Sequence, residues 1–536
     1  MNQIETYILL LGIIFIVGIL FNKKSAPLSL LLVIVGMILS FVPEFPRVQL
    51  EPQLVLNVFL PLLVYEASAQ TSWREVKKDL RPIALLSVGH VLFITVLVAS
   101  VLHAVVPGLS WSLCFVLGAV ISPPDDIAIV ALAEKLYLPR RIITILTAEG
   151  LFNDATALVI FRFALVAVVT QEFSFTAAID KFLVIVLCEI VYGIALGFII
   201  GEIRLRLKDA KLQILISLLT PFLAYTPAVM LGGSGVLATV VAGILLGHRY
   251  MHRFAPEIRL LGTSVWSMLV FLLQSILFLL IGLELRFIVE RITSMSIASL
   301  ALYSLLVVAV VIVGRFLWVF PAAYLPRFLF PAIRKKDPYP KWQYLFIIAW
   351  SGMRGGISLA AALAVPLLPP ASGISSPKDL LVFLVFSVIF LTLILQGLAL
   401  PWVVKVLGIQ TERRREKLQE HMSELSARLT MTKAVLRWLL KYRTQVKEDA
   451  HFYAEINTYI KQYQILRKRI TRAIENHDDS EEHDELKEVE GLVIPSAEII
   501  KIERKVLEQL WVEKKITQAV RNKLLLQLDF RSRYFG

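Results

Sequence analysis

The sequence predicts an all-α polytopic membrane protein with about thirteen transmembrane helices, arranged as inverted repeats, and a cytoplasmic helical tail. Of its 536 residues, 57% are hydrophobic and 18% are charged, whereas soluble chains carry about 25% charged residues. Apolar segments long enough to span a bilayer recur along the chain. The formal net charge of +13 comes from Lys and Arg that gather in the short loops between these segments. That placement is typical of membrane topology and argues against nucleic acid as a partner.

The apolar segments are separated by loops that are alternately rich in and nearly free of basic residues. They lie at residues 6–22, 27–42, 54–70, 82–106, 111–133, 142–169, 179–203, 211–231, 233–249, 264–289, 296–325, 343–369 and 379–408. Every second loop is basic, as at Lys23-Lys24 and Arg140-Arg141, and the others are nearly free of Lys and Arg. The positive-inside rule therefore predicts that the N-terminus lies outside. Because the chain lacks a cleavable targeting segment and a long disordered tail, we expect a multi-pass protein of the cell (inner) membrane. The first segment has no basic n-region and no cleavage site, so we expect a retained span.

The composition changes after Gly408 from apolar to charged and helix-forming. We therefore expect a transmembrane domain over residues 1–408 and a cytoplasmic helical domain with a regulatory role over residues 409–536. The acidic run at residues 476–485 contains two histidines, and we interpret it as a solvated linker rather than a metal or pH-sensing site.

Segment 142–169 places two carboxylates, Glu149 and Asp154, inside the apolar layer. At the helical rise, Asp154 lies about 18 Å in from Ile142, near mid-depth. A charge there costs several kcal/mol unless it is paired, protonated or facing a polar cavity. Membrane proteins keep such groups chiefly to move ions or protons, so the segment predicts a transporter rather than an enzyme.

Two further segments carry helix breakers at mid-membrane. The fifth segment contains Pro123 and Pro124, which remove backbone donors and obstruct the preceding turn. The twelfth contains Gly352, Gly355 and Gly356, which weaken the helix from within. Interrupted segments at matching places in two halves of a chain indicate a secondary-transporter binding site. Because the two segments are seven spans apart, an odd number, the two halves would be inverted relative to each other.

Burial of a carboxylate favours its protonated form, whereas a nearby cation favours the charged form. Such a group holds either a proton or a hard monovalent cation, and alternating exposure to the two sides then couples the two fluxes. Hard cations take oxygen ligands. We therefore expect a cation site formed by Asp154, Asp125, Ser122 and the carbonyl groups freed by Pro123 and Pro124.

Two charged residues near this site need separate predictions. Arg354 stays charged at any accessible pH, so it needs a partner within the membrane, and we predict a core-stabilising ion pair with Glu149. Asp126 is either a second ligand or a residue of a water-filled funnel, and we rank it below Asp125.

Four motifs resemble those of the monovalent cation/proton antiporters, with the sodium/proton exchangers of NhaP type as the closest branch. They are Ser122-Pro-Pro-Asp125, Ala148-Glu-Gly-Leu-Phe-Asn-Asp-Ala-Thr-Ala157, Gly233-Ser-Gly-Val-Leu-Ala-Thr-Val-Val-Ala-Gly243 and Ser351-Gly-Met-Arg-Gly-Gly-Ile-Ser-Leu-Ala-Ala361. The resemblance covers residues 6–408. It implies a homodimer in the lipid bilayer, an elevator-like core with two crossed, broken helices, and no cofactor besides the transported Na⁺ and H⁺.

The resemblance also implies roles for single residues. Asp154 carries the cation and the proton, Asp125 is a site residue on the broken helix, and Na⁺ binds at these two carboxylates. Asn153 is a supporting polar group, and Asn before the Asp implies electroneutral exchange. Glu149 and Arg354 match the positions that stabilise the core. The chain departs from the family at Gly150, where Ser is usual, and at Pro124-Asp125-Asp126, where many members have Thr-Asp-Pro; both departures bear on cation selectivity and stoichiometry.

Several alternatives remain open at the level of the sequence. The transported cation is Na⁺, Li⁺ or K⁺, so a K⁺/H⁺ antiporter is the first alternative. A cation channel lined by acidic residues is less favoured. An intramembrane aspartyl protease lacks its Gly-x-Gly-Asp element here, and a zinc protease lacks His-Glu-x-x-His.

Overall fold

The computed structural model describes residues 3–21, 28–43, 45–125, 138–170, 175–292, 295–366, 376–445, 450–476 and 497–532, together with residues 130, 132 and 136. These residues form helices joined by turns and short extended stretches, and no strand lies among them. The all-α prediction is therefore confirmed. The chain forms two compact units. The first contains Met1–Arg253 and Ser264–Gln410, and the second contains Phe254–Thr263 and Thr411–Gly536.

The first unit holds the apolar helices. Its elements are α1 (Gln3–Phe21), α2 (Leu28–Ser40), α3 (Pro52–Leu54), α4 (Leu60–Gln70), α5 (Trp73–Lys78), α6 (Leu80–Ala84), α7 (Val91–Val105), α8 (Trp111–Ile121), α10 (Arg140–Thr170), α11 (Phe175–Arg206), α12 (Ala210–Met230), α13 (Val236–Leu245), most of α14 (Pro256–Arg291), α15 (Ile297–Leu329), α16 (Pro331–Lys336), α17 (Trp342–Trp350), α18 (Gly356–Leu363) and α19 (Pro377–Val406). Wider π-helical turns, η1 (Val55–Phe59), η2 (Leu85–His90) and η3 (Leu246–Tyr250), join some of these helices, and η4 (Met251–Arg253) is a single 3₁₀ turn.

The helix lengths fit a polytopic membrane protein. Within the described residues, eight helical stretches are long and apolar enough to cross a bilayer: Pro52–Gln70, Leu80–Val105, Arg140–Thr170, Ile179–Arg206, Ala210–Met230, Pro256–Arg291, Ile297–Leu329 and Pro377–Val406. Shorter apolar helices lie at Ile8–Leu20, Leu28–Ser40 and Trp111–Ile121. Each of the thirteen apolar segments predicted from the sequence contains helix, while the number of complete spans stays a prediction.

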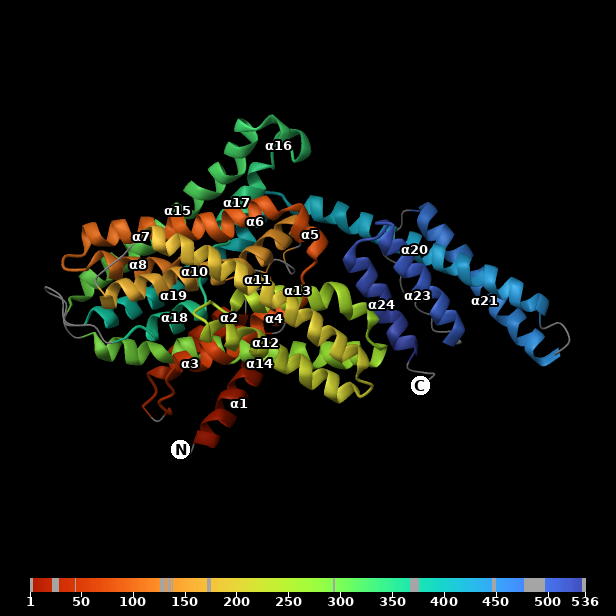
Figure 1. Ribbon diagram of the computed structural model, residues 1–536, viewed down its shortest axis with the longest axis horizontal. Coiled ribbons are helices and arrows are strands. Elements are labelled where there is room, and N and C mark those ends of the chain that lie inside the picture. The colour runs from red at the N-terminus through yellow and green to blue at the C-terminus, as the bar shows by residue number, and fades with distance from the viewer. Residues whose placement is uncertain are drawn as a thin grey trace. The chain divides into compact units, whose positions relative to one another are not determined.

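The interrupted helices lie inside the first unit. Helix α8 ends at Ile121, just before the two prolines, and α17 and α18 are separated by the non-helical residues 351–355. Helix α8 packs against α7 and α10, and these three run side by side in Figure 1. The packing against α7 is close, because a Cβ on Gly118 would collide with the backbone of Thr95. Helix α18 packs against α8 and α19, so both interruptions face the same interior.

The second unit contains the tail helices α20 (Gln410–Gln445), α21 (Ala450–Asn476), α23 (Ala497–Val512) and α24 (Gln518–Ser532). Apolar side chains of α20 and α21 form one core, and a second core joins α20 to α23 and α24. The first turns of α14 belong to this unit, where Arg259 donates from Nε to Oδ2 of Asp529 at 2.8 Å. The acidic run predicted as a linker lies almost wholly outside the described residues.

Candidate functional site

The two interrupted segments touch through their backbones. The N–H of Asp125 donates to the carbonyl of Met353 at 2.7 Å. The carboxylate of Asp125 lies directly against Gly355, where any added Cβ would collide with Oδ2. Gly355 is also the residue before the first turn of α18. The glycine predicted as a helix breaker therefore also makes room for a carboxylate at the positive end of a helix.

A cavity of about 40 Å³ lies at this crossing. Its polar side chains are Asp125, Asp154 and Ser358. Pro123, Pro124, Ile357 and apolar residues of α4 and α10 complete its walls. About 10–15 Å³ of such volume is enough to hold one water molecule, so the cavity has room for about three water molecules, or for one cation with a few of its waters. Gly150 lines the same cavity without contributing a side-chain oxygen.

A second, smaller cavity of about 10 Å³ adjoins the first. Asp154 and Ser358 line both cavities, but the second extends along α10 towards Phe161, whereas the first includes Gly150. Because α10 runs from Arg140 to Thr170, the two cavities lie towards opposite ends of this helix. Asp154 therefore lies between the two cavities.

Asn153 joins α10 to the broken segment. Its Nδ2 donates to the carbonyl of Pro124 at 3.1 Å, and its Oδ1 is buried and makes no hydrogen bond within the described residues. The residue is fully buried and is absent from both cavity walls. Asn153 thus holds the segment that carries Asp125 while its neighbour Asp154 faces the cavity.

Ser122 and Ser358 have different surroundings. The hydroxyl of Ser122 donates to the carbonyl of Ala119 at 2.9 Å, and the residue lines neither cavity. Ser358, which the sequence analysis did not single out, lines both cavities. Its position within the motif Ser351–Ala361, two residues after Gly356, was the available signal. Asp126 lies outside the described residues.

Glu149 forms a buried ion pair with Arg315. Nη1 and Nη2 of Arg315 donate to the two carboxylate oxygens at 2.6 and 2.9 Å, and Nε donates to the carbonyl of Ile348 at 3.1 Å. The side chains of Arg315 and Glu149 are 0% and 1% exposed. The predicted pairing of Glu149 with Arg354 was therefore wrong in its cation. Sequence position shows that these charges lie inside apolar segments, but it gives no information about the side of α10 on which each arginine lies.

Arg354 binds peptide carbonyls instead. Its Nε donates to Ile121 O at 2.9 Å, its Nη2 donates to Ser122 O at 3.4 Å, and its Nη1 donates to Gly352 O. These carbonyls end α8 and follow the end of α17. Each helix C-terminus carries about −0.5 of an elementary charge, so the two ends together balance one guanidinium. The backbone N–H of Arg354 also donates to the hydroxyl of Thr392 on α19, at 3.2 Å.

Arg162 and Glu189 hold a loop of the same unit. Nη1 of Arg162 donates to the carbonyl of Gly233. The carboxylate of Glu189 accepts hydrogen bonds from the hydroxyl of Ser234 and from the N–H groups of Gly235 and Ala238, at 3.0–3.2 Å. Glu189 therefore caps the N-terminus of α13, and the two residues act on one loop rather than on each other.

Crossed, interrupted helices around buried carboxylates define a secondary transporter of the membrane. Comparison with known proteins gives the family. The transmembrane sodium/hydrogen exchanger family matches residues 11–406. The Na⁺/H⁺ antiporter ApNhaP of Aphanothece halophytica is 31% identical over 419 residues, which cover 78% of this chain and 76% of that protein. This protein belongs to the sodium/hydrogen exchanger family.

Two further relatives extend this comparison. A protein of Bacillus subtilis, named a sodium, potassium, lithium and rubidium/H⁺ antiporter, is 28% identical over 466 residues, or 84% of this chain and 68% of its own length. The sodium proton antiporter MjNhaP1 of Methanocaldococcus jannaschii matches in structure with a TM-score of 0.59. The match covers 76% of this chain and 99% of MjNhaP1 at 18% sequence identity, and it supports the shared fold.

Proposed function

We propose that this protein exchanges Na⁺ for H⁺ across the membrane, with the cation and the proton competing for Asp154. The observation that carries the proposal is the meeting of Asp154, Asp125 and Ser358 at one small cavity where two interrupted segments cross. Carboxylate and hydroxyl oxygens are the ligands that hard cations prefer. The cavity has room for a cation that has lost most of its water.

The two carboxylates have different tasks. Asp125 lies at the positive N-terminal end of α18, which stabilises a negative charge there. Asp154 belongs to the middle of α10, far from either end of that helix, and borders both cavities. Asp154 therefore takes up the proton when the cation leaves, and Asp125 completes the cation's oxygen shell. Exposure of Asp154 first to one cavity and then to the other couples the two fluxes.

The stoichiometry follows from the number of titrating groups. If Asp154 alone changes its occupant, one cation is exchanged for one proton and no net charge moves. Asn153 supports this count because its amide carries no charge and holds Pro124. K⁺ is the second candidate cation, since the Bacillus subtilis relative is named for several alkali ions.

We further propose the membrane location, orientation and oligomeric state of the protein. The protein lies in the cell (inner) membrane, and the positive-inside rule supports an orientation with the N-terminus outside and residues 409–536 in the cytoplasm. In this orientation the N-terminal end of α10 is cytoplasmic, and the larger cavity opens from that side of Asp154. Resemblance to the exchangers supports a homodimer in which residues 1–408 transport and residues 409–536 regulate.

The test is proton movement in proteoliposomes that contain a pH dye. Na⁺, Li⁺ or K⁺ is added outside, with the membrane potential free or clamped by valinomycin in the Na⁺ and Li⁺ arms. Proton flux driven by one cation and insensitive to the potential supports electroneutral antiport and identifies the cation. Flux that follows the potential contradicts the one-for-one count, and cation conduction without proton flux contradicts antiport itself.

A further inference from the structure

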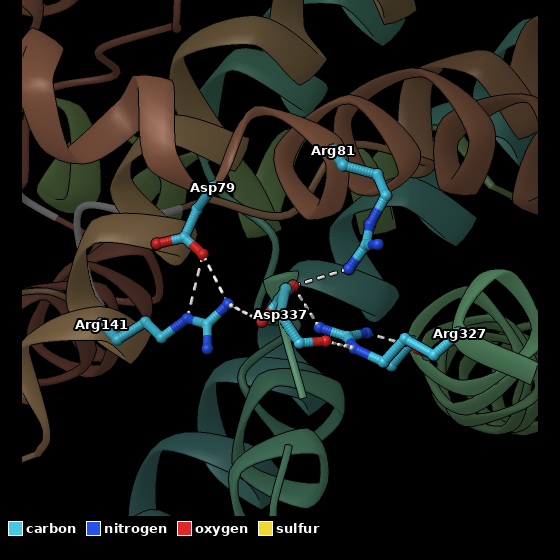
Figure 2. Close-up of polar contacts among 6 residues, drawn as sticks. Asp79, Arg81, Arg141, Arg327 and Asp337 are labelled. Atoms are coloured by element: carbon cyan, nitrogen blue, oxygen red, sulfur yellow. Dashed lines mark hydrogen bonds and ion pairs between the residues drawn. The ribbon is translucent and has the colours of Figure 1, made fainter. Parts of the chain in front are cut away.

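Five charged side chains meet at one end of the first unit. Asp337, between α16 and α17, accepts hydrogen bonds from Arg81, Arg327 and Arg141 at 2.7, 2.6 and 3.1 Å. Asp79 accepts from Arg141 at 2.6 Å. Figure 2 shows Asp337 between the three guanidinium groups, which come from α6, α10 and α15. Three arginines face two carboxylates, so this arginine cluster keeps one positive charge in excess.

The arginine cluster also keeps free donors. In the described part of the chain, Arg81 uses only Nη2, and Arg141 uses Nε and Nη2. Nε and Nη1 of Arg81 and Nη1 of Arg141 are therefore available to another acceptor. The side chains of Arg81 and Arg141 are 28% and 41% exposed, so a ligand can reach them. Guanidinium groups present parallel donors that match the oxygens of a phosphate.

The more exposed Arg81 and Arg141 form the rim of a cleft that Arg327 also lines and whose walls are mainly apolar. Leu85, Ile142, Val319 and Ala322 belong to the walls, and the enclosed part has a volume of about 50 Å³. The wall residues come from η2, α10 and α15, each part of a helical stretch apolar enough to cross a bilayer. A small polar anion would use the rim alone. A ligand with a charged head and an apolar chain would use both rim and walls.

We propose that this cleft binds the headgroup of an anionic phospholipid. Its phosphate accepts hydrogen bonds from Arg81 and Arg141, and the first methylene groups of one acyl chain lie against Leu85, Val319 and Ala322. Charged hydrogen bonds between arginine and phosphate are about twice as strong as neutral ones. Basic pockets between transmembrane helices on the cytoplasmic side suit anionic headgroups. The proposal rests on the membrane orientation proposed above, which puts this end of the unit at the cytoplasmic leaflet.

The lipid would act on the elements that carry the transport site. Arg141 lies in the first turn of α10, which holds Asp154, and Asp337 lies in the connection that leads into α17. An anion bound to Arg81 and Arg141 balances the excess positive charge of the arginine cluster.

The test measures binding by thermal unfolding of the purified full-length protein in neutral detergent. Phosphatidylglycerol, phosphatidylcholine and millimolar inorganic phosphate are added in separate arms, and native mass spectrometry counts the lipids that stay bound. Three variants are compared with the wild type. Arg81→Gln removes the free donors of Arg81 together with its ion pair to Asp337. Ala322→Trp fills the wall without touching the ion pairs. Lys335→Gln is the matched control, because it removes one positive charge from an exposed residue of the neighbouring helix α16.

We expect phosphatidylglycerol to raise the unfolding temperature of the wild type and of Lys335→Gln, and we expect each of these proteins to retain one lipid. In Arg81→Gln and Ala322→Trp the shift in unfolding temperature should fall by at least half. Equal shifts in all variants would mean a general surface effect and would overturn the proposal. A shift with inorganic phosphate that survives in Ala322→Trp would assign the cleft to a free anion instead. If Arg81→Gln does not fold, Ala322→Trp decides the outcome alone. Because binding is read without transport, failure here leaves the exchange proposal untouched.

Discussion

The ion pair between Glu149 and Arg315 allows a quantitative test. Replacing Arg315 by Met removes a bidentate contact and a hydrogen bond to Ile348, and it leaves the carboxylate of Glu149 buried without its cation. Breaking a buried pair from one side costs about 3–5 kcal/mol. Both side chains are almost fully buried, so we expect Arg315→Met to destabilise the protein near the upper end of this range.

A double-mutant cycle isolates the interaction itself. Glu149→Gln combined with Arg315→Met removes both charges. We expect the double variant to lose at least about 2 kcal/mol less unfolding free energy than the two single variants lose in sum, as is found for groups in direct contact. Arg354 binds carbonyls rather than Glu149. The matching cycle between Glu149→Gln and Arg354→Met should therefore give less than half of that coupling.

The assay is reversible unfolding in mixed detergent micelles, followed by circular dichroism as the fraction of SDS rises. Arg315→Lys is the control for charge alone, because an ammonium group keeps the charge but cannot form the two parallel hydrogen bonds. A larger coupling between Glu149 and Arg354 than between Glu149 and Arg315 would refute the reasoning from the structure and restore the pairing predicted from the sequence.

Three further predictions can be checked separately. Asp154→Asn should abolish exchange while the protein still folds, because an amide cannot bind and release a proton; dye-detected flux above the background of empty vesicles would contradict this. Gly355→Ala should lower exchange at least tenfold, because the new Cβ would displace the carboxylate of Asp125; unchanged flux would show that this contact is dispensable. In the tail, burial raises the pKa of Glu424, but hydrogen bonds and charges from its basic neighbours outweigh burial and hold the pKa below its usual value. Its contribution to stability is therefore present above the unfolded pKa of about 4.3 and is lost as the pH falls through the lower folded pKa. The stability of α20 is measured in urea by hydrogen exchange, in the wild type and in Glu424→Gln. At pH 7 we expect α20 to be more stable in the wild type than in the variant, and at pH 3 we expect this difference to shrink.

The sequence predicted the features of this protein that depend on local chemistry. Runs of apolar residues give helices that suit a bilayer, and proline pairs or clustered glycines interrupt them wherever they occur. The breaks after Ile121 and after Trp350 were therefore predictable. The carboxylate of Asp154 was recognisable because so few residues of its type occur inside an apolar segment.

The partners of these residues were not predictable in the same way. Helical rise gives the depth of a residue in the membrane, but the rotation of each helix about its axis depends on packing with segments far away in the sequence. Glu149 and Arg354 both lie inside apolar segments, yet Glu149 binds Arg315. For the same reason Ser122 appeared to be a candidate ligand by its place in the sequence, and Ser358 was overlooked, although Ser358 is the serine that borders the cavity.

The surroundings of Arg354 have a consequence for the transport cycle. A side-chain carboxylate beside this guanidinium would gain or lose a proton with pH, and its charge would change together with that of the site. Peptide carbonyls are not protonated at any pH at which the protein is folded, and a side-chain substitution does not remove them. The electrostatic background at the crossing thus stays constant while Asp154 changes its occupant. The pH dependence of exchange should then reflect the titration of one group, and no substitution of a single neighbouring side chain should imitate the loss of Arg354.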